Sequence, residues 1–350
     1  MSRNNITRIV MLVAGAALLG MATASVVAAP IKIDAAVAPV PAAEGDGRIV
    51  EQRPCYFPFD SYASWLSFIH DRQARGGDAF DEPAFRAAYP ASAFHALVGG
   101  REVECWQITY LSGGLKVAGY VVGPRGRTAA PRPLVIFNRG GNRGFGRLVF
   151  TNLVDFARWS QEGFVVLASQ YRGGPGSEGD DEFGGADVDD VMNLFGVARE
   201  LGNVDMRNVF MQGVSRGGLM TYLALQRGAQ VNAAAVVGGP TDLSLEADHR
   251  PEMQALYREL IPNFDADPGA ALRARRVLDF ADRLSAPLLI LHGGADWRVD
   301  PQQALALAQR LQALQRPYEL LVYAGDDHGL SRNGDDCWRR MVGWFRQHMK

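Results

Sequence analysis

The sequence has few cysteines, little net charge and no internal repeats, and each of these shortages argues against a class of protein. Its 350 residues include three cysteines, none with the spacing of a zinc site or of a CxxC redox pair. No charge is in excess, because the formal net charge is −2 and no basic stripe runs along the chain. This balance argues against nucleic acid as the main partner. Internal repeats are absent as well, so the sequence predicts neither a metal site nor a repeat architecture.

Long apolar runs are also scarce, and the one near the N-terminus is short. A positively charged start precedes an apolar stretch over 9–20, and small residues follow it. This layout is typical of a secretory signal peptide, which we assign to 1–29, with cleavage after Ala24 or Ala29. The alternative is an uncleaved membrane anchor, although the stretch is too short to span a bilayer comfortably. We expect a periplasmic or secreted protein with no membrane contact after cleavage.

Export permits a disulfide bond. We pair Cys55 with Cys105, because both precede the main part of the fold, and we expect Cys337 to remain a buried thiol. Residues 30–52 are rich in Ala and Pro without any period, which predicts a flexible leader. Residues 53–104 read as a helical extension.

One helix of this extension has a clear pattern. Tyr62, Trp65, Leu66 and Ile69 recur at helical spacing, which predicts an aromatic face turned to the core. Asp60 is expected to cap the helix.

From residue 105 onward, strands alternate with amphipathic helices. The strand candidates are 105–111, 115–122, 134–138, 165–169, 209–212, 234–238, 288–292 and 318–323. The first two are close enough to form a hairpin, and the later ones are short continuous apolar runs, as in a sheet buried on both faces. We therefore predict an α/β fold over 105–350, with a mostly parallel eight-stranded sheet flanked by helices. Residues 241–279 form a charged, helix-prone, cap-like insertion between two strands.

One serine stands at a sharp corner in this pattern. Ser215 lies between an apolar strand and a helix, with Gly213 and Gly217 two positions to either side. Glycines there remove the side chains that would clash in so tight a turn, and the serine is left exposed at a helix N-terminus. This is the G-x-S-x-G nucleophile elbow, and Ser215 is the predicted nucleophile.

A serine hydroxyl needs a base that is itself oriented by a carboxylate. The elbow predicts the chain order serine, acid, histidine, with each residue after a later strand. Asp296 follows the strand over 288–292 and is the predicted orienting acid, whereas His328 follows the last strand and is the predicted base. His292 ends a strand, where we interpret it as structural packing. Three nearby acids remain alternative orienters: Asp300, Asp326 and Asp327.

The oxyanion that forms during attack on a carbonyl needs donors. One is expected to be the backbone N–H of Arg216, directly after the serine. The other should come from the loop after the third strand, where Gly140 lets a backbone amide approach and the Asn138 side chain is a further candidate. Arg139 lies between these two.

Residues 174–179 spell G-x-G-x-x-G, the pattern of a dinucleotide site. No helix starts there at once, and the acids that follow would repel a pyrophosphate, so we predict no nucleotide cofactor. We expect these acids to form a solvated turn, to cap a helix near Asp187, and to pair with Arg172.

Several stretches together resemble the catalytic domain of the prolyl oligopeptidase family, within the α/β-hydrolase fold. They are LSGGLKVAGYVVGP, YRGGPGSEGDDEFGGADVDDV, GVSRGGLMTYLAL, LLILHGGADWRVDP and GDDHGL, which occur in this order between residues 105 and 350. The resemblance implies that Ser215, Asp296 and His328 cleave peptide or ester bonds without a metal or an organic cofactor.

Two features depart from the family. Its larger members carry a β-propeller, and the segment before the sheet is too short for one here, so exopeptidase specificity is not inherited. Many family peptidases also use a tyrosine after the third strand for the oxyanion, and here Asn138 and Arg139 stand in its place. Both departures bear on the peptidase activity, not on hydrolysis as such.

The sequence thus predicts an exported serine hydrolase that cleaves short peptides through an acyl-enzyme. A carboxylesterase using the same three residues is the alternative. A secreted binding protein on a hydrolase scaffold is a third possibility, but it predicts a damaged site, whereas all three residues are present.

Overall fold

The computed structural model describes residues 45–76, 80–126 and 130–350, all within one compact unit. The predicted signal peptide and the first part of the predicted leader lie outside the described residues. Within these three ranges, no helix is both long and apolar enough to cross a membrane.

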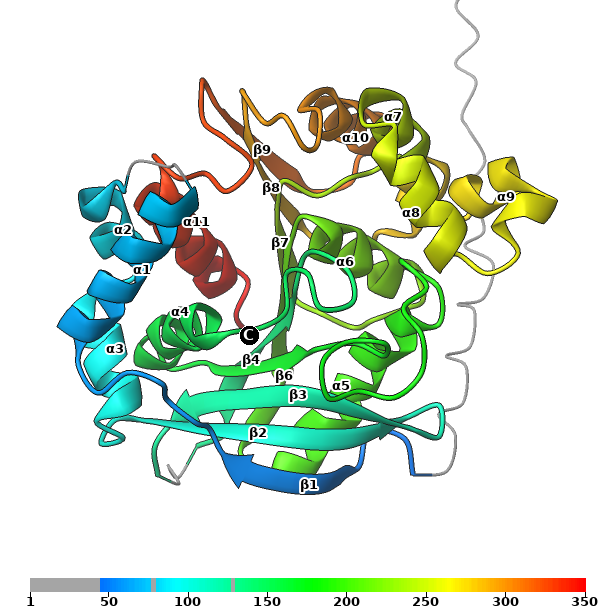
Figure 1. The fold of residues 1–350 in the computed structure, drawn as a ribbon. Coiled ribbons are helices and arrows are strands. Elements are labelled where there is room, and N and C mark those ends of the chain that lie inside the picture. The colour runs from blue at the N-terminus through cyan, green and yellow to red at the C-terminus, as the bar shows by residue number, and fades with distance from the viewer. Residues whose placement is uncertain (1–44, 77–79, 127–129) are drawn as a thin grey trace, which may run out of the picture. The chain divides into compact units, whose positions relative to one another are not determined.

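A nine-stranded sheet forms the centre of the fold, in the order β1-β2-β3-β5-β4-β6-β7-β8-β9 (Figure 1). Following this order across the sheet, the neighbouring pairs from β1 to β5 are antiparallel. The neighbouring pairs from β5 through β4 to β9 are parallel. The strands are β1 (Ile49–Pro54), β2 (Val103–Ser112), β3 (Leu115–Pro124), β4 (Arg132–Asn138), β5 (Val165–Ser169), β6 (Val204–Val214), β7 (Ala233–Val237), β8 (Leu288–Gly293) and β9 (Tyr318–Tyr323).

Helices cover both faces of this sheet. The helices are α1 (Tyr62–Gly76), α2 (Glu82–Ala88), α3 (Ala91–Val98), α4 (Phe150–Gln161), α5 (Asp187–Leu201), α6 (Arg216–Gln226), α7 (Leu243–His249), α8 (Glu252–Leu260), α9 (Pro268–Arg273), α10 (Gln302–Ala313) and α11 (Gly334–Gln347), with two 3₁₀ turns, η1 (Phe264–Ala266) and η2 (Val277–Arg283). Helices α5, α6, α8 and α10 pack on one face, and α1, α3, α4 and α11 pack on the other.

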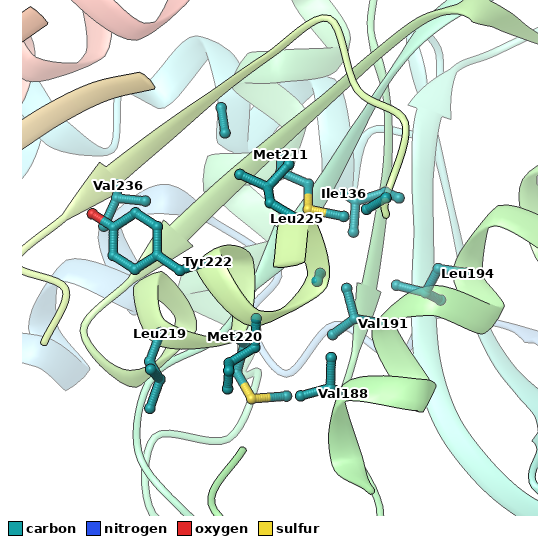
Figure 2. Close-up of a cluster of buried hydrophobic side chains, with 14 of the residues drawn as sticks. Ile136, Val188, Val191, Leu194, Met211, Leu219, Met220, Tyr222, Leu225 and Val236 are labelled. Atoms are coloured by element: carbon teal, nitrogen blue, oxygen red, sulfur yellow. The ribbon is translucent and has the colours of Figure 1, made fainter. Parts of the chain in front are cut away.

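The alternation of side chains along β4 shows why both faces are apolar. Leu134 and Ile136 join the core that contains α5 and α6, while Val135 and Phe137 join the core that contains α4 and α11. Figure 2 shows the first of these cores, where strand residues such as Ile136 lie against α5 and α6. The parallel strands between these two layers of helices all end at the same edge of the sheet. The predicted site residues lie at this edge.

All eight predicted strands are present, with ends that differ by a few residues, and the hairpin between β2 and β3 is confirmed. The prediction of eight strands was nevertheless wrong by one. Residues 49–52, assigned to the leader, belong to β1, which pairs antiparallel with β2 at the edge of the sheet. The side chains of β1 are half-buried or exposed, so its sequence carries no alternation of apolar and polar residues that would reveal a strand.

The helical extension is also largely as predicted. The disulfide between Cys55 and Cys105 is confirmed and ties the end of β1 to β2, and Cys337 is a buried free thiol. Tyr62, Trp65 and Leu66 are buried, as their spacing predicts. The cap of α1 differs: the Ser61 hydroxyl accepts from the Ser64 N–H, and Asp60 accepts from the Ser64 hydroxyl instead.

Candidate active site

Ser215 lies between the end of β6 and the start of α6 in a conformation that L-residues rarely adopt, with φ 55° and ψ −128°. The flanking glycines make this possible. A Cβ at Gly213 would lie 2.3 Å from the Gly217 carbonyl oxygen, and one at Gly217 would lie 1.9 Å from the Asn138 carbonyl oxygen. Strand, serine and helix therefore approach each other too closely for any side chain at these two positions.

Asp296 and His328 lie beside each other at the same edge of the sheet. Nδ1 of His328 is 2.7 Å from Oδ2 of Asp296, and the carboxylate is buried while the imidazole is 15% exposed. The other three acids are engaged elsewhere. Asp300 accepts from the N-terminus of α10, and Asp326 and Asp327 accept from backbone N–H groups of the loop that carries His328.

The Asp296 carboxylate is held in its ionised form. Burial alone would raise its pKa, but hydrogen bonds from His292 and His328 and from the backbone N–H of Val299 outweigh burial and hold the pKa below its usual range. A carboxylate that stays ionised fixes the Nδ1–H tautomer of His328, which leaves Nε2 free to accept a proton.

The end of β7 brings Ser215 and His328 together. The backbone N–H of Ser215 donates to the Val237 carbonyl at 2.8 Å. The next residue, Gly238, has the His328 ring against it, since a Cβ there would lie 3.1 Å from Nδ1. In the described part of the chain no hydrogen bond joins the two side chains, as is common in substrate-free sites.

Backbone amides next to Ser215 are suited to bind an oxyanion. Arg216 is the first residue of α6, so its N–H has no acceptor within the helix. Gly140 contacts the serine, because a Cβ there would lie 3.1 Å from the Ser215 Cβ. The Asn138 side chain does not share this position: its amide nitrogen donates to the Thr221 hydroxyl at 2.8 Å in the core beneath the elbow.

The two arginine side chains that flank this site hold its loops in place. The Arg139 guanidinium donates to four carbonyl oxygens, from Gly140, Arg143, Phe145 and Gln170. Burial lowers its pKa to about 10.

The Arg216 guanidinium is almost fully buried between the carboxylates of Asp181 and Asp187. The expectation of a solvated acidic turn holds for Glu178 and Asp180, which are exposed, but is wrong for Asp181, which is buried against the Arg216 cation. Arg172 was expected to pair with an acid of that turn, but its partner is Asp190 of α5, at 2.8 Å.

A small cavity of about 90 Å³ lies beside Ser215. Helices α7 and α8 of the predicted insertion supply Glu246, Met253 and Tyr257 to a wall of mixed polarity, which also contains Phe183 and Arg298. Burial raises the pKa of Glu246 to about 7, although the nearby Arg250 opposes this shift. Glu246 is therefore partly protonated at neutral pH.

Two polar residues of this region have roles that the sequence did not reveal. His292 was expected to pack in the core, and it is fully buried, but its Nε2 also lies 3.1 Å from Asp296 Oδ2. Its position four residues before Asp296 is the signal that could have connected the two. Glu246 was hidden in the insertion, where no motif distinguishes it from neighbouring acids.

A serine on a nucleophile elbow, beside an ionised Asp–His pair at the carboxyl edge of an α/β-hydrolase sheet, defines the class of serine hydrolases. Comparison with known proteins agrees with this class. The model of the prolyl oligopeptidase family matches residues 151–350, and the chain belongs to that family.

The relatives differ greatly in length. The uncharacterized peptidase YtmA of Bacillus subtilis is 30% identical to this chain, in an alignment that covers 71% of this chain and 95% of YtmA. The dipeptidyl aminopeptidase BIII of Pseudoxanthomonas mexicana is 27% identical over 59% of this chain, which spans only 32% of that protein.

Solved structures show the same fold. A puromycin-hydrolyzing peptidase of Mycobacterium tuberculosis has a TM-score of 0.60 at 25% identity, covering 67% of this chain and 38% of its own. The acylaminoacyl peptidase of Pyrococcus horikoshii has a TM-score of 0.62 at 21% identity, covering 71% and 42%.

Proposed function

We propose that the chain is an exported serine peptidase that cleaves short peptides through an acyl-enzyme formed on Ser215. The observation that carries this proposal is the convergence of three elements: the strained elbow of Ser215, the His328–Asp296 hydrogen bond, and the end of β7 that lies between them. Membership of a peptidase family supports the reaction class.

We assign each step of the proposed reaction to a residue of the site. The Ser215 hydroxyl attacks the scissile carbonyl while His328 Nε2 takes its proton. The N–H groups of Arg216 and Gly140 bind the oxyanion. His328 then donates the proton to the leaving amine, and the cycle ends when a water molecule, deprotonated by His328, hydrolyses the ester on Ser215.

The small cavity beside Ser215 supports a preference for small residues on the acyl side of the scissile bond. Its volume of about 90 Å³ suits a compact side chain, and its wall combines apolar residues such as Phe183 and Val299 with charged ones such as Glu246. Relatives named for dipeptidyl and acylaminoacyl substrates suggest short peptides. This chain spans about a third of the dipeptidyl relative, so its own substrates remain the subject of this proposal.

Export is supported by the signal-peptide layout of 1–29 and by the disulfide between Cys55 and Cys105, since such bonds persist in oxidising compartments. Fractionation of cells that express the full-length protein tests this part. The proposal requires a shortened mature protein outside the cytoplasm.

Ester hydrolysis is the second candidate. A putative carboxymethylenebutenolidase of Escherichia coli is 24% identical over 41% of this chain. The proposed oxyanion donors are backbone amides, as in esterases, and no tyrosine follows β4 at the usual place.

The deciding experiment measures kcat/KM on an aminoacyl anilide and on the matched acyl ester, with wild type and Ser215→Ala. Anilide turnover that disappears in the variant supports the peptidase. Turnover of the ester alone would establish the esterase instead. Equal turnover by wild type and variant would refute both, and the melting temperature of the variant shows that it is folded.

A further inference from the structure

A second cavity, of about 310 Å³, is lined by residues next to the proposed reacting groups. Its wall includes Gly140, which contacts Ser215, and Gly329, which follows His328. The wall also includes Arg139, Tyr89 directly after α2, Asp155 and Arg158 of α4, and Trp338 of α11. The helical extension, α4 and α11 thus line a space whose wall also includes the chain neighbours of Ser215 and His328, Val214 and Gly329.

Asp155 is the unusual member of this wall. It is half-buried, and no described residue donates a hydrogen bond to its carboxylate or forms an ion pair with it. A carboxylate that is partly withdrawn from water without a partner is unfavourable unless a cation or a hydrogen-bond donor reaches it. Burial raises the pKa of Asp155 to about 6, so the group is largely ionised at neutral pH.

The neighbouring arginine does not satisfy this carboxylate. The Arg158 guanidinium donates to the Ala88 carbonyl at 2.5 Å, lies 3.6 Å from Asp335, and stacks over the Trp338 ring at 4.3 Å. These three contacts use both terminal nitrogens and one face of the group. Asp155 therefore faces the cavity with its charge uncompensated by direct contact.

The wall also carries two cations, Arg139 and Arg158, and the Arg139 guanidinium already donates to four backbone carbonyl oxygens. The remaining polar groups that we consider are neutral. The Asn152 carbonyl oxygen accepts from the Val149 N–H, and the Gln212 carbonyl oxygen accepts from the Trp159 indole. Burial raises the pKa of Tyr89 to about 12, so its hydroxyl stays neutral. An ammonium group that entered would find in the Asp155 carboxylate an acceptor to which no described residue donates, whereas both arginines already have acceptors.

We propose that this cavity is a substrate subsite in which the Asp155 carboxylate binds a primary ammonium group of the peptide. The inference rests on the proposed peptidase function and adds a charge preference to it. An ammonium group could come from a lysine side chain or from a free N-terminus. The position of Gly329, next to the residue that protonates the leaving amine, places the cavity on the leaving-group side, which favours a lysine after the scissile bond.

The test uses two pairs of short peptides, with cleavage measured by chromatography. In the first pair the N-terminus is acetylated, and lysine or norleucine follows the scissile bond. In the second pair lysine is absent, and the N-terminus is free or acetylated. We expect wild type to prefer one charged member by about tenfold in kcat/KM, the equivalent of one charge-assisted contact.

Two variants then locate the preference. Asp155→Asn should reduce the charged-to-neutral ratio to about one. Asp335→Asn is the matched control, because it removes a carboxylate from the outer side of the same arginine, and it should keep the wild-type ratio. Equal loss in both variants would show a general field effect and overturn direct binding.

The wild-type comparison needs no variant, so the test survives even if Asp155→Asn fails to fold. Wild type that cleaves charged and neutral peptides equally well would overturn the subsite while leaving the peptidase function intact. Wild type that cleaves none of the four peptides, but hydrolyses esters, would overturn the peptidase function first, and the subsite with it.

Discussion

Nε2 of His292 lies 3.1 Å from Oδ2 of Asp296, the same oxygen that lies 2.7 Å from Nδ1 of His328. The carboxylate is therefore held between two imidazoles, one in the core and one at the proposed site. Nε2 of His292 also lies 2.9 Å from the Val299 carbonyl oxygen, so this nitrogen carries the proton. His292 acts on His328 only through Asp296, as a positioning residue.

We predict that His292→Leu lowers kcat by about tenfold or more, because a hydrogen bond to a charged group contributes about 1.5 to 3 kcal/mol. His292→Gln can place an amide N–H near the same point and should recover most of the loss. Rescue by the conservative variant separates this role from simple packing. Loss of the donor should lower kcat with little change in KM and be recovered by His292→Gln, whereas a packing defect alone would lower the melting temperature of both variants without this recovery.

Gly217→Ala should prevent correct folding of the elbow, because its Cβ would lie 1.9 Å from the Asn138 carbonyl oxygen. The atoms that it would meet are backbone atoms of Asn138 and Arg139, which have little room to relax, so we expect a loss of more than about 3 kcal/mol, comparable to severe overpacking. Gly343→Ala in α11 is the control, since no atom lies within 4 Å of the added methyl. It should stabilise the protein by about 0.5 to 1 kcal/mol. Chemical denaturation of both variants checks the pair, and a Gly217→Ala protein as stable as wild type would contradict the contact.

Arg216→Met should destabilise the protein by about 3 to 5 kcal/mol, because Asp181 and Asp187 would keep buried charges without a partner. The exposed pair of Arg258 and Asp265 offers a comparison in which solvent screens both charges. Arg258→Met should change stability by less than about 1 kcal/mol. Urea unfolding measures both, and similar losses in the two variants would show that the buried cluster is not special.

Glu246 should make stability depend on pH in a defined direction. Its pKa is about 7 when folded and about 4.5 when unfolded, so the unfolded chain releases this proton first as the pH rises. The contribution of this group to stability therefore falls by up to about 3 kcal/mol between about pH 4.5 and 7. Above pH 7 it stays constant. Glu246→Gln cannot ionise and should melt above wild type at pH 8 but close to it at pH 5. A constant difference between the two proteins across this range would exclude the titration of Glu246 as the cause.

Local patterns were sufficient to predict the sheet and the three proposed reacting residues. Strands buried on both faces appear in the sequence as continuous apolar runs. The glycines around Ser215 indicate the tight turn of a nucleophile elbow, so the sequence was enough to predict the parallel strands and the elbow. Strand β1 was not, because an exposed edge strand is defined by its partner β2 and not by its own residues.

Long-range charge pairs were equally hidden from the sequence. Asp181 and Asp187 stand among several acids, and only the fold brings Arg216 between them. Asp155 gave no signal either, since an isolated acid on a helix is usually solvated. Its surroundings come from α2 and α11, which are far from it in the chain.

Ser215 keeps a backbone conformation that costs about 1 to 3 kcal/mol and that the surrounding strands impose. Selection for heat resistance and selection for turnover should therefore act in opposite directions at this position. A library screened only for folded protein at high temperature would accumulate glycine at residue 215, while one screened for turnover would retain serine. The residue found at position 215 therefore indicates whether selection acted on stability or on turnover.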